Sequence, residues 1–130
     1  LLSKTMPWKN SYLPKFERMP FQFFLQQLND EKSKLFMQQY MVPNSREKNI
    51  HGILEVKIYG TLVEQDKNII KALFQDYKIN DTTITVSLGR QIISFVESKV
   101  HSVEVILDCE NEEKSTKQIE IGNNLIIKNN

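Results

Sequence analysis

Residues 53–80 read ILEVKIYGTLVEQDKNIIKALFQDYKIN, and residues 102–130 read SVEVILDCENEEKSTKQIEIGNNLIIKNN. Each stretch begins with apolar residues at every second position, passes through a charged turn and ends in a segment rich in Ile, Leu and Asn. A period of two is typical of half-buried strands. The two stretches therefore predict a β-rich core. The alternating apolar residues are Leu54, Val56 and Ile58, then Val103, Val105 and Leu107.

The segments between these strands carry weaker signals. Residues 82–87, TTITVS, are rich in β-branched side chains and predict a strand. Residues 92–96 fit a short helix or a strand. Residues 69–79 fit a helix better than a strand, because Ile69, Ile70 and Leu73 follow helical spacing. Both alternatives remain open for residues 69–79.

The N-terminal third has a different character. Residues 1–20 contain three of the four prolines and the only tryptophan, which predicts an extended arm packed over the domain. Residues 21–41 are predicted to be helical, because apolar residues there follow the i, i+3, i+4, i+7 spacing of one helix face. Core packing is the favoured role of this stripe, and a partner-binding groove is the alternative. The stripe consists of Phe21, Phe24, Leu25 and Leu28.

Together these patterns predict an α+β fold. We expect one domain over residues 1–130, with a small β-barrel-like core at 53–130 and one or two packed helices. The core would be of the oligonucleotide-binding, staphylococcal-nuclease-like or Tudor-like type. The chain begins with Leu-Leu rather than Met, so we expect a domain excised from a larger protein.

Composition narrows the function classes. The net charge of +1 provides no global field for nucleic acid. Residues 1–50 carry eight basic and four acidic groups, however, whereas residues 51–130 carry nine basic and twelve acidic groups. The single cysteine excludes an internal disulfide and suits a reducing, cytoplasmic location inside the cell. No apolar run is long enough to span a membrane, so we expect no membrane association.

No catalytic motif is evident. The phosphate-binding pattern G-x-x-x-x-G-K-[ST] and the dinucleotide pattern G-x-G-x-x-G are both absent from the sequence. His51, His101 and Cys109 do not follow the spacing of metal ligands. We therefore predict a protein that is not an enzyme and that needs no metal or cofactor.

A family resemblance sharpens the expected function. The strands LEVKIYGT and VEVILDCENEEK, each followed by a charged turn, resemble the end of the staphylococcal-nuclease-like half of extended Tudor domains. The segment FQDY at residues 74–77 is similar to the F-x-D-Y core of the Tudor barrel. Lys78 and Ile79 stand where that family usually has Gly-Asn. The resemblance implies a non-catalytic scaffold domain that binds a peptide or a partner protein, in an assembly that processes RNA.

The resemblance also implies a binding site. The rings of Tyr59, Phe74 and Tyr77 would surround a methylated cation, which aromatic faces attract electrostatically. Asp76 or Asn80 would lie at the rim of this cage. Phe74 fits core packing at least as well as a cage.

A second hypothesis is binding of single-stranded nucleic acid, including RNA, by an oligonucleotide-binding-type domain. Lys9, Lys15 and Arg18 would contact phosphates, and Trp8 and Tyr12 would stack on bases.

Overall fold

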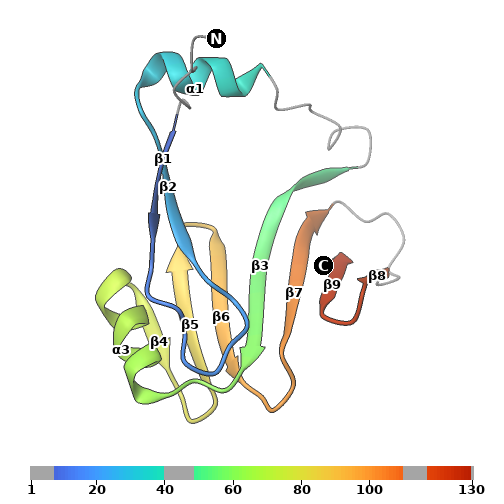
Figure 1. Ribbon diagram of the computed structural model, residues 1–130. Helices are drawn as coiled ribbons and strands as arrows, with labels where there is room; N and C mark the ends of the chain where they lie inside the picture. The colour runs from blue at the N-terminus through green and yellow to red at the C-terminus, as the bar shows by residue number, and fades with distance from the viewer. Residues whose placement is uncertain (1–7, 40–48, 110–116, 130) are drawn as a thin grey trace.

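The computed structural model describes residues 8–39, 49–109 and 117–129. This part of the chain contains nine strands and two helices (Figure 1). In chain order they are β1 (Trp8–Tyr12), β2 (Phe24–Leu28), α1 (Glu31–Gln38), β3 (Ile50–Gly60), α3 (Glu64–Leu73), β4 (Tyr77–Ile79), β5 (Thr83–Leu88), β6 (Gln91–Glu97), β7 (Ser102–Cys109), β8 (Gln118–Ile121) and β9 (Leu125–Asn129).

The strands form one large and one small sheet. The large sheet has the order β4-β5-β6-β3-β7-β9-β8, and β1 and β2 form a separate antiparallel ribbon. The longest strand, β3, lies at the centre, parallel to β6 and antiparallel to β7. The two stretches that dominate the sequence thus begin as strands, as their alternation predicts, and the structure shows that these two strands are neighbours. They end differently, since the first continues into α3 and the second ends in the β8-β9 hairpin.

The predicted barrel is wrong. Strands make up 51% and helices 17% of the described residues, and the seven-stranded sheet is open. A barrel requires the first and last strands of the sheet to pair with each other. Among the described residues, β4 pairs with β5 alone and β8 pairs with β9 alone. The fold is therefore a mostly β, open mixed sheet rather than an α+β barrel.

The helix predicted across residues 21–28 is also wrong. Residues 24–28 form β2, which pairs with β1 from Trp8 opposite Leu28 to Tyr12 opposite Phe24. The apolar residues of this region fit a period of two as well as a helical period, and pairing with β1 selects the strand. Helix α1 begins only after it, where the Asp30 carboxylate accepts a 2.7 Å hydrogen bond from the Ser33 backbone N–H. That bond lowers the pKa of Asp30.

Residues 69–79 are partly helical. Helix α3 starts at Glu64, inside the segment expected to be a charged turn, and it ends at Leu73. Phe74 has extended backbone angles, and β4 follows at Tyr77. The helical prediction is thus right for the first half of this segment and wrong for the second half.

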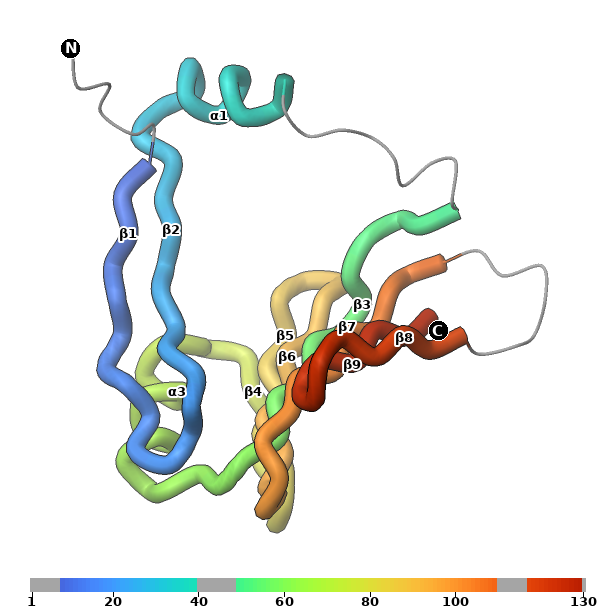
Figure 2. The backbone as a smooth tube through the Cα atoms, turned by 45° about the vertical axis from the view of Figure 1, so that its right-hand side comes forward, coloured from blue at the N-terminus to red at the C-terminus, as the bar shows by residue number. Residues whose placement is uncertain are grey.

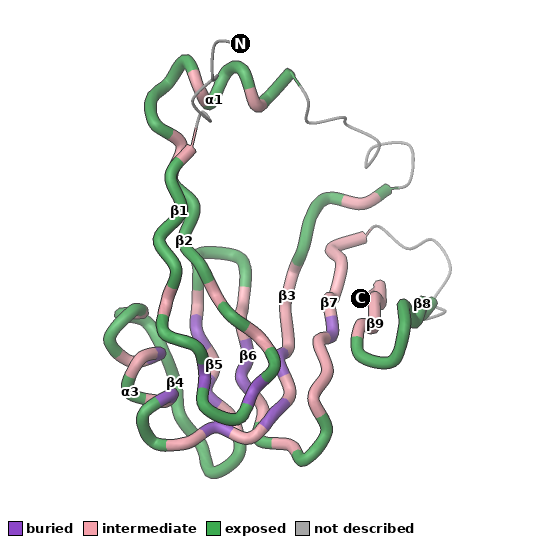
Figure 3. Tube along the Cα trace, viewed as in Figure 1, coloured by how far each residue is buried: buried purple, intermediate pink, exposed green. Residues whose placement is uncertain are grey.

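The core lies on one face of the large sheet. Ile58, Phe95 and Ile84 occupy one row across β3, β6 and β5, and all three are buried. Helix α3 and the loop between β1 and β2 cover this part of the face, and buried residues concentrate there in Figure 3. Within the described part of the chain, no helix or loop covers the same face over β7, β9 and β8, where Ile119 and Ile121 are exposed.

The opposite face of the sheet carries a network of charges. Glu104 on β7 lies 3.9 Å from the Lys57 ammonium and 3.0 Å from the Lys128 ammonium. Glu55 accepts a 2.6 Å hydrogen bond from the Ser94 hydroxyl and lies 3.8 Å from Lys57. These side chains satisfy one another across four strands, so this face combines charged groups with apolar residues such as Ile92 and Ile106.

Two phenylalanines test the difference in burial between the core and the β1-β2 ribbon. Phe95 is 3% exposed, and Phe95→Ala should cost about 3–5 kcal/mol of unfolding free energy, because it leaves a cavity in the core. Phe24 is 50% exposed on the ribbon, so Phe24→Ala should cost less than about 1 kcal/mol. Urea denaturation of both variants measures the difference. Equal losses would contradict the placement of β2 on the surface.

A candidate apolar binding cavity

An apolar cavity lies between the β1-β2 ribbon, α3 and the covered face of the sheet. Its volume is about 280 Å³, and every side chain that lines it is apolar. The lining comes from the ribbon and its loop (Leu13, Phe16, Phe23, Phe24, Leu25), from α3 and its end (Ile70, Leu73, Phe74) and from β5 and β6 (Leu88, Ile93, Phe95).

The floor of the cavity is buried and its rim is exposed. Phe16, Ile70 and Phe95 form the floor, and each is at most 3% exposed. Leu25 and Leu73 lie at the rim and are 53% and 37% exposed. The cavity therefore opens to solvent at the edge of the ribbon. An apolar group entering it would lose water contact on most sides.

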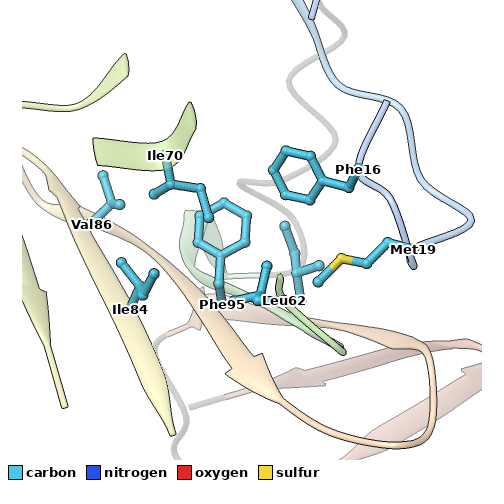
Figure 4. Packing of buried hydrophobic residues seen from close by; sticks show 8 residues of the cluster. Phe16, Met19, Leu62, Ile70, Ile84, Val86 and Phe95 are labelled. Carbon is cyan, nitrogen blue, oxygen red and sulfur yellow. The ribbon is translucent and has the colours of Figure 1, made fainter. Parts of the chain in front are cut away.

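Three aromatic rings hold the ribbon above the sheet. The centroid of Phe23 lies 5.1 Å from that of Phe16 and 6.1 Å from that of Phe95, and the Phe16 and Phe95 centroids are 6.3 Å apart. These tilted and edge-on arrangements are the favourable ones for aromatic pairs. Figure 4 shows Phe16 and Met19 reaching from the loop toward Phe95 and Leu62. The arm predicted at residues 1–20 thus contributes two buried side chains to the core.

A buried carboxylate fixes the loop to α3. Asp66 is 1% exposed and accepts hydrogen bonds from the backbone N–H groups of Glu17, at 3.2 Å, and Val63, at 3.3 Å. The second bond satisfies a donor at the start of α3, where backbone N–H groups lack helical partners. The first bond joins the N-terminal loop to that helix. Asp66 therefore sets the distance between two walls of the cavity.

A glycine permits the close approach of the same loop to the sheet. A Cβ atom at Gly60 would lie 3.0 Å from the Met19 methyl carbon and 3.1 Å from the His101 Nδ1 atom. Gly60 ends β3 directly beneath the loop. A larger residue would require the side chains of Met19 and His101 to shift.

The structure does not bring the expected aromatic cage together. Tyr59 pairs with Val96, which pairs with Thr83, so these three side chains share one face of the sheet. Tyr77 pairs with Val86, three residues from Thr83 and therefore on the other face. The strands β3 and β4 are also three positions apart, about 14 Å at a spacing of about 4.8 Å.

The other three residues of the expected cage, Phe74, Asp76 and Asn80, lie in different local environments. Phe74 lines the apolar cavity. Asn80 accepts hydrogen bonds from the backbone N–H groups of Thr82 and Thr83, at 3.1 and 2.8 Å, and so shapes the β4-β5 turn. Asp76 is exposed, and its backbone carbonyl accepts a bond from the Ser87 N–H. Of the five residues, only Phe74 lies in the cavity.

The residues expected to bind nucleic acid also divide between two faces. Trp8 and Tyr12 lie on one face of the ribbon, and Lys9 lies on the other, because successive side chains alternate along β1. The Tyr12 ring packs 5.7 Å from the Phe24 ring. Lys15 and Arg18 are exposed in the following loop.

Sequence reasoning missed most of the cavity. Phe23, Ile70, Ile93 and Phe95 belong to it, but none was expected in a site. The available signal was the alternation of Phe21, Phe23 and Leu25, which a helical reading of the same stretch obscures.

Comparison with family models, with curated proteins and with solved structures finds no match for this chain. The description of the site therefore depends on its geometry. No helix within residues 8–39, 49–109 and 117–129 is long and apolar enough to cross a membrane. In the same ranges, no three His, Cys, Asp or Glu side chains gather as metal ligands would.

The Asp66 bridge gives a direct prediction. Asp66→Ala should lower the unfolding free energy by about 1–3 kcal/mol, because two backbone donors lose their acceptor in a buried place. Asp66→Asn should cost less, since the amide oxygen can still accept one bond. Asp81→Ala is the matched control at an exposed aspartate and should change stability by less than about 0.5 kcal/mol. Urea denaturation measures the unfolding free energy of the three variants. Equal losses in Asp66→Ala and Asp81→Ala would contradict the bridging role of Asp66.

Proposed function

We propose that this domain is a non-catalytic interaction module that binds a peptide or a partner protein by enclosing one or two apolar side chains in the cavity. The observation that supports the proposal is a solvent-open cavity lined entirely by apolar side chains. Burial of apolar surface contributes about 25 cal/mol per Å², so a single enclosed Leu or Phe side chain would add substantially to affinity.

The chemistry of the lining favours binding over catalysis. General acid–base or nucleophilic catalysis needs an ionisable or nucleophilic group beside the reacting atoms. None of the eleven side chains that line the cavity carries such a group. The volume of about 280 Å³ also lies just below the range of about 300–1,000 Å³ that is usual for small-molecule pockets. Single apolar side chains of a partner fit this space better than a cofactor.

The wider setting of this proposal comes from the family resemblance. The short motifs shared with extended Tudor domains favour a scaffold in an RNA-processing assembly, inside the cell. In our proposal the partner is held by apolar contacts in the cavity rather than by a cage of ring faces around a methylated cation.

Binding of a defined probe tests the proposal. The probe is a fluorescein-labelled peptide of eight residues that alternates Asp with Phe or Leu. The control peptide carries Ser in place of every Phe and Leu. We expect the apolar peptide to bind and the serine peptide to bind at least about tenfold more weakly, as the loss of two enclosed side chains predicts. Fluorescence anisotropy measures both affinities.

Two lysine substitutions locate the binding. Leu73→Lys places a charge at the rim of the cavity, whereas Ile121→Lys places one on the uncovered part of the sheet. Both residues are exposed apolar side chains, so both variants should keep the fold. At about 1 M salt, which screens the attraction between a new lysine and the aspartates of the probe, Leu73→Lys should weaken binding of the apolar peptide by about tenfold or more, because a charge near the cavity resists desolvation. Ile121→Lys should leave the affinity unchanged. The opposite pattern, or no binding of the apolar peptide, would contradict the proposal.

A further inference from the structure

Among residues 8–39, 49–109 and 117–129, no third strand pairs with the β1-β2 ribbon, so each of its strands has an edge without a partner strand there. A two-stranded ribbon is marginally stable alone, and unpaired strand edges readily accept another strand. The Leu13 N–H donates to the Phe23 carbonyl at 3.0 Å, so Leu13 and Phe23 form a hydrogen-bonded pair at the end of the ribbon. Bonded and non-bonded pairs alternate in an antiparallel ladder. Ser11 opposite Leu25 and Lys9 opposite Gln27 are therefore the next bonded pairs.

It follows that three residues of β2 direct their backbone groups away from β1. These are Phe24, Gln26 and Leu28, which occupy the non-bonded positions. Across residues 8–39, 49–109 and 117–129, no strand other than β1 pairs with β2. The side chains of Phe24 and Gln26 are exposed. The outer edge of β2 thus offers three N–H and three C=O groups to an incoming strand.

This edge lies beside the cavity. In both Figure 1 and Figure 2, β2 is the strand of the ribbon nearer to β3, and β1 lies on its far side. Phe24 and Leu25 of β2 line the cavity, and Phe23 directly precedes the strand. In a strand added to β2, every second side chain would point to the same face as Leu25, toward the cavity.

The charges around β2 select the partner. Three exposed cations lie in the segments that precede and follow the strand, and they make no ion pair within the described part of the chain: Lys15 and Arg18 in the β1-β2 loop and Lys32 in α1. Of the three nearby carboxylates, that of Asp30 caps α1 and that of Glu31 pairs with Lys34, which leaves that of Glu17. The segment around β2 therefore attracts an acidic chain.

We propose that the outer edge of β2 binds an extended acidic peptide as an added strand, with alternate apolar side chains entering the cavity. This inference rests on the proposed function and specifies how the peptide is held. The backbone bonds supply the orientation of the peptide, the cavity selects apolar residues at every second position, and the cations select acidic residues between them.

The geometry favours a peptide over single-stranded RNA. A strand edge matches the spacing of peptide N–H and C=O groups, whereas nucleic acid needs stacking rings and cations on one surface. Here the rings of Trp8 and Tyr12 and the ammonium of Lys9 lie on opposite faces of the ribbon.

A proline substitution tests the edge. Gln26→Pro removes an N–H that points outward and that the ribbon does not use, and proline is tolerated on edge strands. Gln26→Ala is the matched control, because both variants lose the 3.3 Å side-chain bond to Asn10 and only proline loses the backbone donor. Gln26→Pro should bind the Asp/Phe/Leu peptide about tenfold more weakly than Gln26→Ala, since a backbone hydrogen bond is lost and the proline ring obstructs strand pairing. Circular dichroism verifies that both variants fold.

Backbone methylation of the peptide provides an independent measurement. Two versions of the probe carry N-methyl groups on alternate residues, one set on the odd and the other on the even positions. Only one set faces β2 in an added strand, so the two versions should differ in affinity by about tenfold or more. A third version, with Lys in place of Asp, should bind more weakly than the acidic probe at low salt.

The outcomes separate this inference from the proposed function. Equal affinity of the two methylated peptides, or of Gln26→Pro and Gln26→Ala, would overturn strand addition. If Leu73→Lys still weakened binding, the cavity would remain the binding site. Binding of a single-stranded oligouridine that displaces the peptide, with equal affinity for Gln26→Pro and Gln26→Ala, would also overturn the inference, because RNA does not need the backbone groups of the edge.

Discussion

The contact between the Phe16, Phe23 and Phe95 rings is the interaction on which the rest of the structure depends. It is the place where the N-terminal third of the chain meets the sheet, and the buried core surrounds it. Without it, the β1-β2 ribbon would depend mainly on Met19 for apolar contact with the core, and two strands alone bury too little surface to be stable. Asp66 reinforces the contact by joining the loop to α3.

The same contact explains why a cavity exists. Three rings in tilted and edge-on arrangements keep the ribbon above the sheet but do not fill the space between β2, the end of α3 and the β5-β6 hairpin. The opposite face of the sheet behaves differently, because Glu104, Lys57 and Lys128 satisfy one another there. The apolar cavity thus lies on the covered face. On that face, the walls of the cavity come from segments far apart in the sequence.

The sequence predicts the strands of the sheet well and the site poorly. Alternation in residues 53–59 and 103–107 is a local signal, and these residues do form the central strands. The same signal cannot show whether a sheet closes, since closure depends on whether β4 and β8 meet. The stripe at residues 21–28 satisfies both helical and strand periods, and only pairing with β1 decides between them. The sequence indicates Phe74 as a candidate site residue. Its neighbours in the cavity, Ile70 and Phe95, are identified only by the fold.

The central claim is that apolar groups bind in the cavity beneath β2, and methyl NMR tests it most directly. Methyl groups of Leu25, Ile70, Leu73 and Ile93 report on the cavity, and those of Val105, Ile119 and Ile127 report on the uncovered part of the same face. With the Asp/Phe/Leu peptide added, we predict shift changes and peptide-to-methyl nuclear Overhauser contacts at the first group only. Contacts confined to the second group, or spread equally over both, would contradict the account.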